Sequence, residues 1–124
     1  MKRKEHEIDS PILDWSLNDE LSLLKSEKQW NSEDRNAKTL IKTSQLCVIL
    51  LVFHKGARMP EHHTIGSMTF LVLSGAIRFS TGKQNRELND HEMISLAKGI
   101  PHDIEALTES SALLTIAYPQ DVSG

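Results

Sequence analysis

The sequence predicts an all-β domain preceded by one short helix. From residue 37 onward, about eight short segments of apolar or alternating residues are separated by turn-forming residues at regular intervals, which is typical of a β-sandwich or barrel. Before them, Leu17, Leu21 and Leu24 recur at helical spacing. A chain of 124 residues is long enough for one domain with its own core. We therefore expect an N-terminal arm and helix over residues 1–36 and one β-barrel over residues 37–120.

Composition and charge exclude several classes of protein. The formal net charge of −3 gives no basic surface for nucleic acid. The longest apolar run, residues 46–53, is too short to cross a membrane as a helix, and the charged N-terminus is not followed by a signal-peptide core. The single cysteine, Cys47, cannot form an internal disulfide and is expected as a small buried side chain. We expect a cytoplasmic protein with no nucleic-acid or membrane partner.

Local sequence patterns predict the order of the helix and strands along the chain. Ser16 followed by Asp19 resembles a capping box and predicts a helix over residues 17–29, followed by a loop. The strands are predicted from β-rich runs bounded by glycine, proline or other turn residues. They cover residues 37–43, 45–54, 67–74, 76–81, 84–89, 92–97, 102–108 and 111–118.

Several predicted strands are apolar on both faces. In residues 67–74, Met68, Phe70 and Val72 face one way, whereas the alternate residues, which include two leucines, face the other. A closed barrel buries only its inner face. The second face must therefore contact another sheet, the N-terminal helix or a partner subunit, and we expect a homodimer.

The candidate binding or catalytic residues lie in two segments that contain histidine. Residues 56–75 read GARMPEHHTIGSMTFLVLSG, and residues 90–105 read DHEMISLAKGIPHDIE. In the first, His62 follows Gly56 after five residues, and Gly75 closes the segment. In the second, Gly99 and Pro101 precede His102. This pair of segments resembles the paired motifs of the cupin superfamily, and in particular its small single-domain members. The resemblance implies a double-stranded β-helix, the jelly-roll barrel, over roughly residues 45–118.

The resemblance also implies a metal site, but two of its usual four ligands are replaced in this sequence. Cupins that bind metal usually do so through three histidines and one glutamate. His62 matches the first histidine and His102 the last, but Thr64 occupies the place of the second histidine and Met68 that of the glutamate. In the second motif, His91 and Ala97 replace a glycine and a proline. The resemblance therefore implies at most a weak site for a divalent metal, such as zinc, iron, manganese or nickel, on His62 and His102.

Three functions remain open. The first is a module that binds a small organic molecule in the barrel, and the predicted pocket residues are His62, Thr64, Met68, Phe70, Val72 and His102. The second is a metal-dependent enzyme, such as a dioxygenase, isomerase or lyase of a small organic acid, in which Glu61, His63 or water would complete the metal shell. The third is a structural or regulatory module whose barrel is filled. No catalytic residue is assigned. Strand alternation turns Glu61 and His63 away from the cavity unless the strand contains a bulge.

Overall fold

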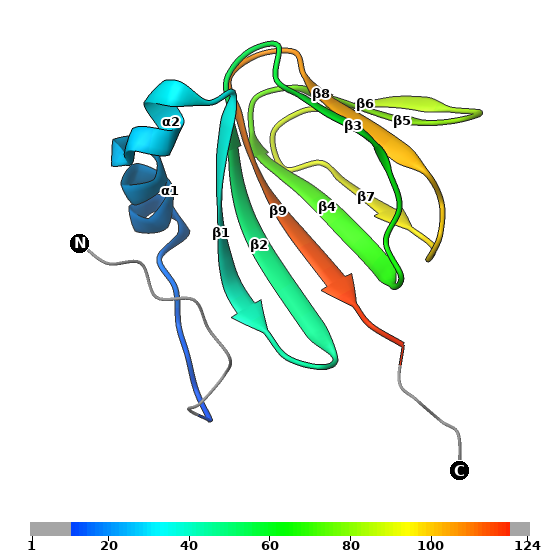
Figure 1. Ribbon diagram of the computed structural model, residues 1–124, viewed down its shortest axis with the longest axis horizontal. Helices are drawn as coiled ribbons and strands as arrows, with labels where there is room; N and C mark the ends of the chain where they lie inside the picture. Colours follow the sequence, from blue (N-terminus) through cyan, green and yellow to red (C-terminus); the bar gives the residue numbers. More distant parts are fainter. Residues whose placement is uncertain (1–10, 120–124) are drawn as a thin grey trace.

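The computed structural model describes residues 11–119, and these form two helices and two antiparallel sheets (Figure 1). Residues 1–10 of the predicted arm and residue 120 of the predicted barrel lie outside the described range. The helices are α1 (Leu17–Ser26) and α2 (Lys28–Ser32). The strands are β1 (Arg35–Lys42), β2 (Leu46–Phe53), β3 (Arg58–His62), β4 (Ser67–Ser74), β5 (Ile77–Thr81), β6 (Asn85–Leu88), β7 (Met93–Leu96), β8 (His102–Ala106) and β9 (Ser110–Ala117).

The strands form a jelly roll. The five-stranded sheet has the order β1-β2-β9-β4-β7, and the four-stranded sheet has the order β3-β8-β5-β6. From β2 to β9 the chain passes repeatedly between the two sheets, so most neighbours within a sheet are distant in sequence, whereas β5 and β6 form a hairpin. In Figure 1 the helices lie beside β1, and the four-stranded sheet lies on the far side of the molecule from them. The predicted all-β class and jelly-roll barrel are confirmed.

The predicted helix of residues 17–29 is wrong in one respect, because it is broken at Glu27. The side chain of Ser16 accepts a hydrogen bond from the Asp19 amide, as the capping box predicts. Glu27, however, has an extended backbone (φ −79°, ψ 150°) that ends α1 and precedes α2. The break coincides with a tertiary contact: the buried Asn36 amide group donates both to Leu24 O at 3.0 Å and to Glu27 Oε1 at 2.8 Å. Helical periodicity does not report such a contact.

The strand pattern is predicted closely except for β3. The segment 67–74 is predicted with the observed bounds of β4, and the other predicted strands agree with the structure to within one or two residues. Residues 58–62 are not among the predicted strands, but they form an edge strand paired only with β8. This strand contains Pro60, and no side chain in it is fully buried. Edge strands tolerate proline and need no apolar alternation, so the usual sequence signals are missing.

Two apolar clusters explain why the strands of the five-stranded sheet are apolar on both faces. The larger cluster fills the space between the sheets and includes Phe53, Phe70 and Phe79. The smaller cluster lies on the outer face of the five-stranded sheet, where Leu24 and Trp30 of the helices pack against Leu50 and Val52 of β2 and Leu40 of β1. The N-terminal helices therefore cover part of the second face.

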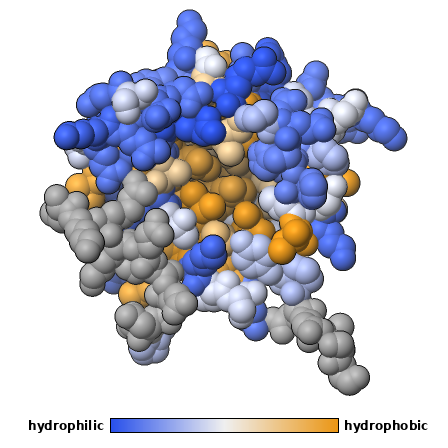
Figure 2. All heavy atoms as spheres, viewed as in Figure 1, coloured by the Kyte–Doolittle hydropathy of each residue, from blue (hydrophilic) through white to orange (hydrophobic). Residues whose placement is uncertain are grey.

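The surface is mixed in character. Figure 2 shows apolar side chains gathered at the centre of one face, surrounded by hydrophilic ones. Within residues 11–119, no helix is both long enough and apolar enough to cross a membrane.

Candidate functional site

The structure brings the two motif histidines side by side. His62 ends the edge strand β3, His102 begins β8, and the two residues are directly paired in the register of the four-stranded sheet. Thr81, at the end of β5, pairs with His102 on its other side. A β-bulge between Met59 and His62 shifts the register, since Met59 pairs with Ile104. The bulge lets Met59 and His62 share a face although they are three residues apart.

The two imidazole rings contact each other and the aromatic core. Their centroids are 4.3 Å apart, with an interplanar angle of 61°. On the side away from His62, Phe79 stacks on the His102 ring at a centroid distance of 5.1 Å and an angle of 13°. Phe70 of the opposite sheet in turn lies 5.7 Å from Phe79. His102 is therefore held between a second imidazole and the apolar interior of the barrel, whereas His62 is only half-buried.

Each ring is oriented by the backbone two residues before it. His62 Nδ1 lies 2.8 Å from Pro60 O, and His102 Nδ1 lies 3.0 Å from Ile100 O. A carbonyl oxygen can only accept, so both Nδ1 atoms donate. Among the hydrogen bonds of residues 11–119, none involves Nε2 of either ring. Neither Nε2 atom is therefore committed to a hydrogen bond within this part of the chain.

The buried ring favours the neutral state. His102 is 1% exposed. Burial lowers the pKa of His102 below its ordinary value of 6.5, and the adjacent His62 lowers it further, against the opposing effects of the Ile100 carbonyl and of Asp103. A neutral imidazole with a protonated Nδ1 carries a lone pair on Nε2.

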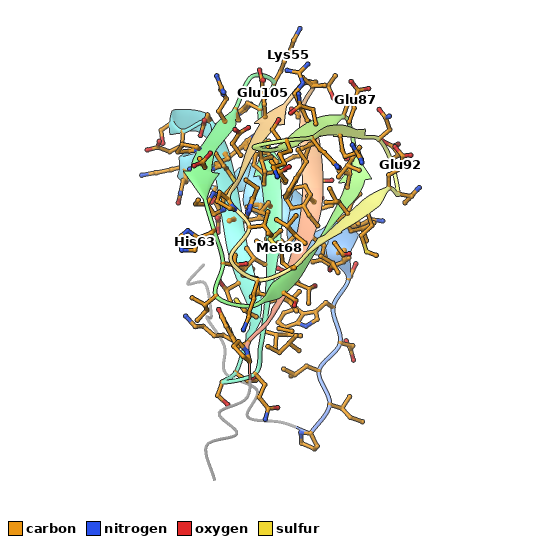
Figure 3. The ribbon with its side chains drawn as sticks, turned by 90° about the vertical axis from the view of Figure 1, so that its right-hand side faces the viewer. Lys55, His63, Met68, Glu87, Glu92 and Glu105 are labelled. Atoms are coloured by element: carbon orange, nitrogen blue, oxygen red, sulfur yellow. The ribbon has the colours of Figure 1, made fainter. Side chains whose placement is uncertain are left out.

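The three predicted lining residues of β4 lie inside the barrel. Met68, Phe70 and Val72 are 3%, 0% and 0% exposed and belong to the core cluster between the sheets. In Figure 3, Met68 lies centrally in the barrel, whereas His63 projects from its side. They pack against the other inner side chains and fill this part of the barrel.

Thr64, also predicted to line the pocket, organises the loop between β3 and β4. Its hydroxyl donates to Gly66 O at 2.8 Å. Its carbonyl accepts from the Gly99 amide at 2.9 Å, which ties this loop to the turn before His102. Gly99 has a φ of +77°, a conformation that favours glycine. These contacts fix the two histidine-bearing segments relative to each other.

The neighbouring charged residues face outward. Glu61 and His63 are exposed, and although a bulge does exist in β3, it precedes His62 and leaves both side chains outside. Glu105 forms an ion pair with Arg78 at 3.1 Å. Cys47 is 4% exposed within the core, as expected from its apolar neighbours.

The donor set does not fit the metal that the family resemblance implies. Within residues 11–119, no group of three or more histidine, cysteine, aspartate or glutamate side chains is placed to hold a metal ion. His62 and His102 supply two imidazoles, the Thr64 hydroxyl is already bonded to Gly66, and Met68 supplies a thioether in place of a carboxylate. Iron and manganese sites need more donors, and harder ones.

A hollow that sequence reasoning missed lies at this end of the four-stranded sheet. Its volume is about 480 Å³, and its lining residues come from three separate parts of the chain: Glu61, Thr81, Gly82, Lys83, Gln84, Ile100 and Pro101. They flank the histidine pair in sequence or in register, since Glu61 precedes His62 and Pro101 precedes His102. A shallower groove of about 410 Å³ lies along β4, β7 and β9 and includes Thr69, Ser95 and Thr115.

Comparison with known proteins identifies the fold. No protein-family model and no curated protein sequence matches the chain. Among solved structures, a cupin superfamily protein from Desulfitobacterium hafniense is 16% identical, with 79% of this chain and 86% of that chain covered and a TM-score of 0.71. A conserved Streptococcus pyogenes protein of unknown function is 19% identical, with 96% and 97% covered and a TM-score of 0.73.

A domain of similar fold also occurs within larger proteins. Salicylate 1,2-dioxygenase from Pseudoaminobacter salicylatoxidans is 13% identical, with a TM-score of 0.74, and the match covers 83% of this chain but 32% of the dioxygenase. At these identities the similarity concerns the fold. Together with the paired histidine motifs and the jelly-roll topology, it shows that this chain has the fold of a small cupin.

Proposed function

We propose that this protein binds a small organic molecule at the end of its barrel, where His62 and His102 meet. One observation carries the proposal: two imidazoles lie 4.3 Å apart, each with its Nδ1 bonded to a backbone carbonyl and its Nε2 without a hydrogen-bond partner among residues 11–119. Neither Nε2 atom is committed to a partner within the described residues, and a polar atom of this kind can bond to a ligand or to an ordered water.

The surroundings favour an organic ligand. Small-molecule sites are concave and mostly apolar, with a few well-placed polar groups. Here the polar groups are the two imidazoles, and the interior that adjoins them is apolar, with Phe79 stacked on His102 and with Met68 and Phe70 in the core between the sheets. The hollow bounded by Thr81, Ile100 and Pro101 is lined by neighbours of the pair in sequence or register, and on this proposal a ligand would approach from there.

A fragment screen followed by melting temperature tests the proposal. A compound that binds the folded state raises the melting temperature by mass action. We expect hits with the native protein that His62→Ala loses, and that His63→Ala, its exposed neighbour on the same segment, retains. A screen without hits, or with hits that His62→Ala leaves unchanged, would contradict the proposal.

The second candidate, a metal-dependent dioxygenase, isomerase or lyase, rests on the same pair. Histidines that bind metal usually donate their other ring N–H to a carbonyl or carboxylate, as both rings do here. The missing carboxylate weighs against this candidate. Metal analysis by mass spectrometry on tag-free protein distinguishes the two: near-stoichiometric iron, manganese, zinc or nickel that disappears in the His62→Ala/His102→Ala variant would favour the enzyme.

A further inference from the structure

The two sheets differ in the charge of their strands. β4, β7 and β9 of the five-stranded sheet contain no charged residue, although 25% of the chain is charged. Every strand of the four-stranded sheet contains at least one. One cross-strand row on its outer face alternates in sign through Arg58, Glu105, Arg78 and Glu87. Because charged side chains are depleted at the centres of protein interfaces, the four-stranded sheet suits contact with water, whereas β4, β7 and β9 suit contact with a protein.

The outward side chains of these three strands form two short cross-strand rows, one apolar and one of hydroxyl groups. They point away from the core, because the alternate residues of each strand lie in the cluster between the sheets. We call the six residues of the two rows the neutral face. The apolar row is Leu113, Leu71 and Met93, and the hydroxyl row is Thr115, Thr69 and Ser95.

The helices leave part of the neutral face uncovered. Leu113 packs against the smaller apolar cluster, which includes residues of α1 and α2. Leu71 and Met93 belong to neither apolar cluster of residues 11–119, and Met93 is 58% exposed. A groove of about 410 Å³ is lined by all three residues of the hydroxyl row. Apolar side chains that lie together on a protein surface mark interaction sites.

The chemistry of the neutral face favours a second copy of the chain as its partner. A two-fold interface places the same surface on both sides, so any charge near the axis faces its like. The neutral face carries no charge. Each threonine or serine hydroxyl both donates and accepts hydrogen bonds, so the hydroxyl row of one copy can bond to that of another. A charged partner would find no group of opposite sign on this face.

We propose that two copies of this chain associate through their neutral faces, which pack against each other about a two-fold axis. Three strands about 4.8 Å apart, over about six residues of about 3.3 Å each, give a face of about 300 Å². A stable dimer commonly buries about 800 Å² per partner. The neutral face therefore supplies the centre of a small interface, and we expect a dimer that dissociates at micromolar concentrations. The four-stranded sheet, with His62 and His102, lies outside this interface.

Sedimentation equilibrium of the full chain tests the proposal. Between about 1 and about 300 µM, the native protein should pass from the chain mass of 14.0 kDa toward twice that mass. Thr69→Lys and Thr69→Glu, on the central strand of the face, should each stay monomeric over this range, because each places like charges on opposing copies. An equimolar mixture of the two variants should recover a dimer, since the introduced charges then attract each other.

Ser80→Lys is the matched control. Ser80 is half-buried, as Thr69 is, and it lies on the outer face of the four-stranded sheet between Asp103 and Asn85. This variant should associate as the native protein does. Circular dichroism and the melting temperature verify that each variant folds. Ser95→Lys, at an exposed position of the neutral face, takes the place of the Thr69 variants if these do not fold.

Four outcomes would contradict the proposal. A native protein that keeps its monomer mass up to about 300 µM would overturn it, and the neutral face would then be bare or covered by a different protein. Unchanged association of a folded Thr69→Lys would also overturn it. Loss of association in Ser80→Lys would place the interface on the four-stranded sheet. A mixture of folded Thr69 variants that stays monomeric would refute the two-fold contact at this face.

Discussion

Replacing Gly66 with alanine tests how rigidly the loop before β4 is held against the end of β9. A Cβ added at Gly66 would contact Ala117 O and lie 2.8 Å from the Ala117 carbonyl carbon. These are backbone atoms, and Ala117 is paired on both sides, with Leu46 of β2 and Ser67 of β4. No side-chain rotation relieves the overlap, so either the strand end or the loop must move.

The expected cost follows from this overlap. Forcing one extra carbon into a packed region costs about 1–3 kcal/mol. For a domain of this size each kcal/mol corresponds to about 4 °C, so the melting temperature should fall by about 4–12 °C. The loop also carries the Thr64 hydroxyl bond to Gly66 O at 2.8 Å. A shift of the loop should therefore also disturb the ¹⁵N signals of His62.

Thermal unfolding followed by circular dichroism measures the effect, with Gly82→Ala as the matched control. A Cβ at Gly82 would meet no atom within 4 Å, so its melting temperature should change by no more than about 2 °C. An unchanged melting temperature for Gly66→Ala would show that the close approach of the loop to β9 is wrong.

Three further predictions concern the histidine pair, the helix break and assembly. Because the pKa of His102 is lowered from 6.5 in the folded state, the unfolded chain binds that proton more readily, and the free energy of unfolding should fall as pH decreases below about 6.5. Urea unfolding at several pH values measures this dependence, which His102→Gln should flatten and His63→Gln should leave unchanged. Asn36→Ala removes the donor to Leu24 O and the acceptor of the Ala37 amide. In urea unfolding it should lower the free energy of unfolding by about 1–3 kcal/mol, whereas the control Asn85→Ala, at an exposed position, should lower it by less than about 0.5 kcal/mol. The homodimer expected from the sequence remains a prediction, and Met93, which is 58% exposed on the outer face of the five-stranded sheet, is a candidate contact residue. Light scattering should give twice the chain mass of 14.0 kDa for the native protein and a lower mass for Met93→Glu, whereas a monomeric native protein would contradict the prediction.

The fold could be predicted from the sequence because the pattern of apolar and polar residues in most strands indicates which side chains are buried. Residues 67–74 alternate between the barrel interior and the outer face, and the observed strand β4 has the predicted bounds. Strand β3 has no such pattern: it lies at an edge, contains Pro60 and buries no side chain fully. The break at Glu27 was missed for a different reason, since its buried hydrogen bond comes from Asn36, which the chain reaches only after the turn into β1.

The site could be predicted only in part. The motif spacing placed His62 and His102 together, and the structure pairs them in register. Their ring orientation depends on the carbonyl groups of Pro60 and Ile100, and residue identity does not encode where those carbonyls point. The hollow was missed because Lys83 and Pro101 are brought to one place by the pairing of β5 with β8, a long-range contact that local patterns do not report.

The departures from the metal-binding pattern have a second chemical consequence. A glutamate at position 68 would supply both a hard metal donor and a negative charge inside the barrel, and a carboxylate close to an imidazole favours the imidazolium. Met68 supplies neither, and burial and His62 then lower the pKa of His102. On the proposed function, methionine in place of a glutamate removes a metal ligand and, at the same time, a carboxylate that would favour the charged form of the buried His102 ring.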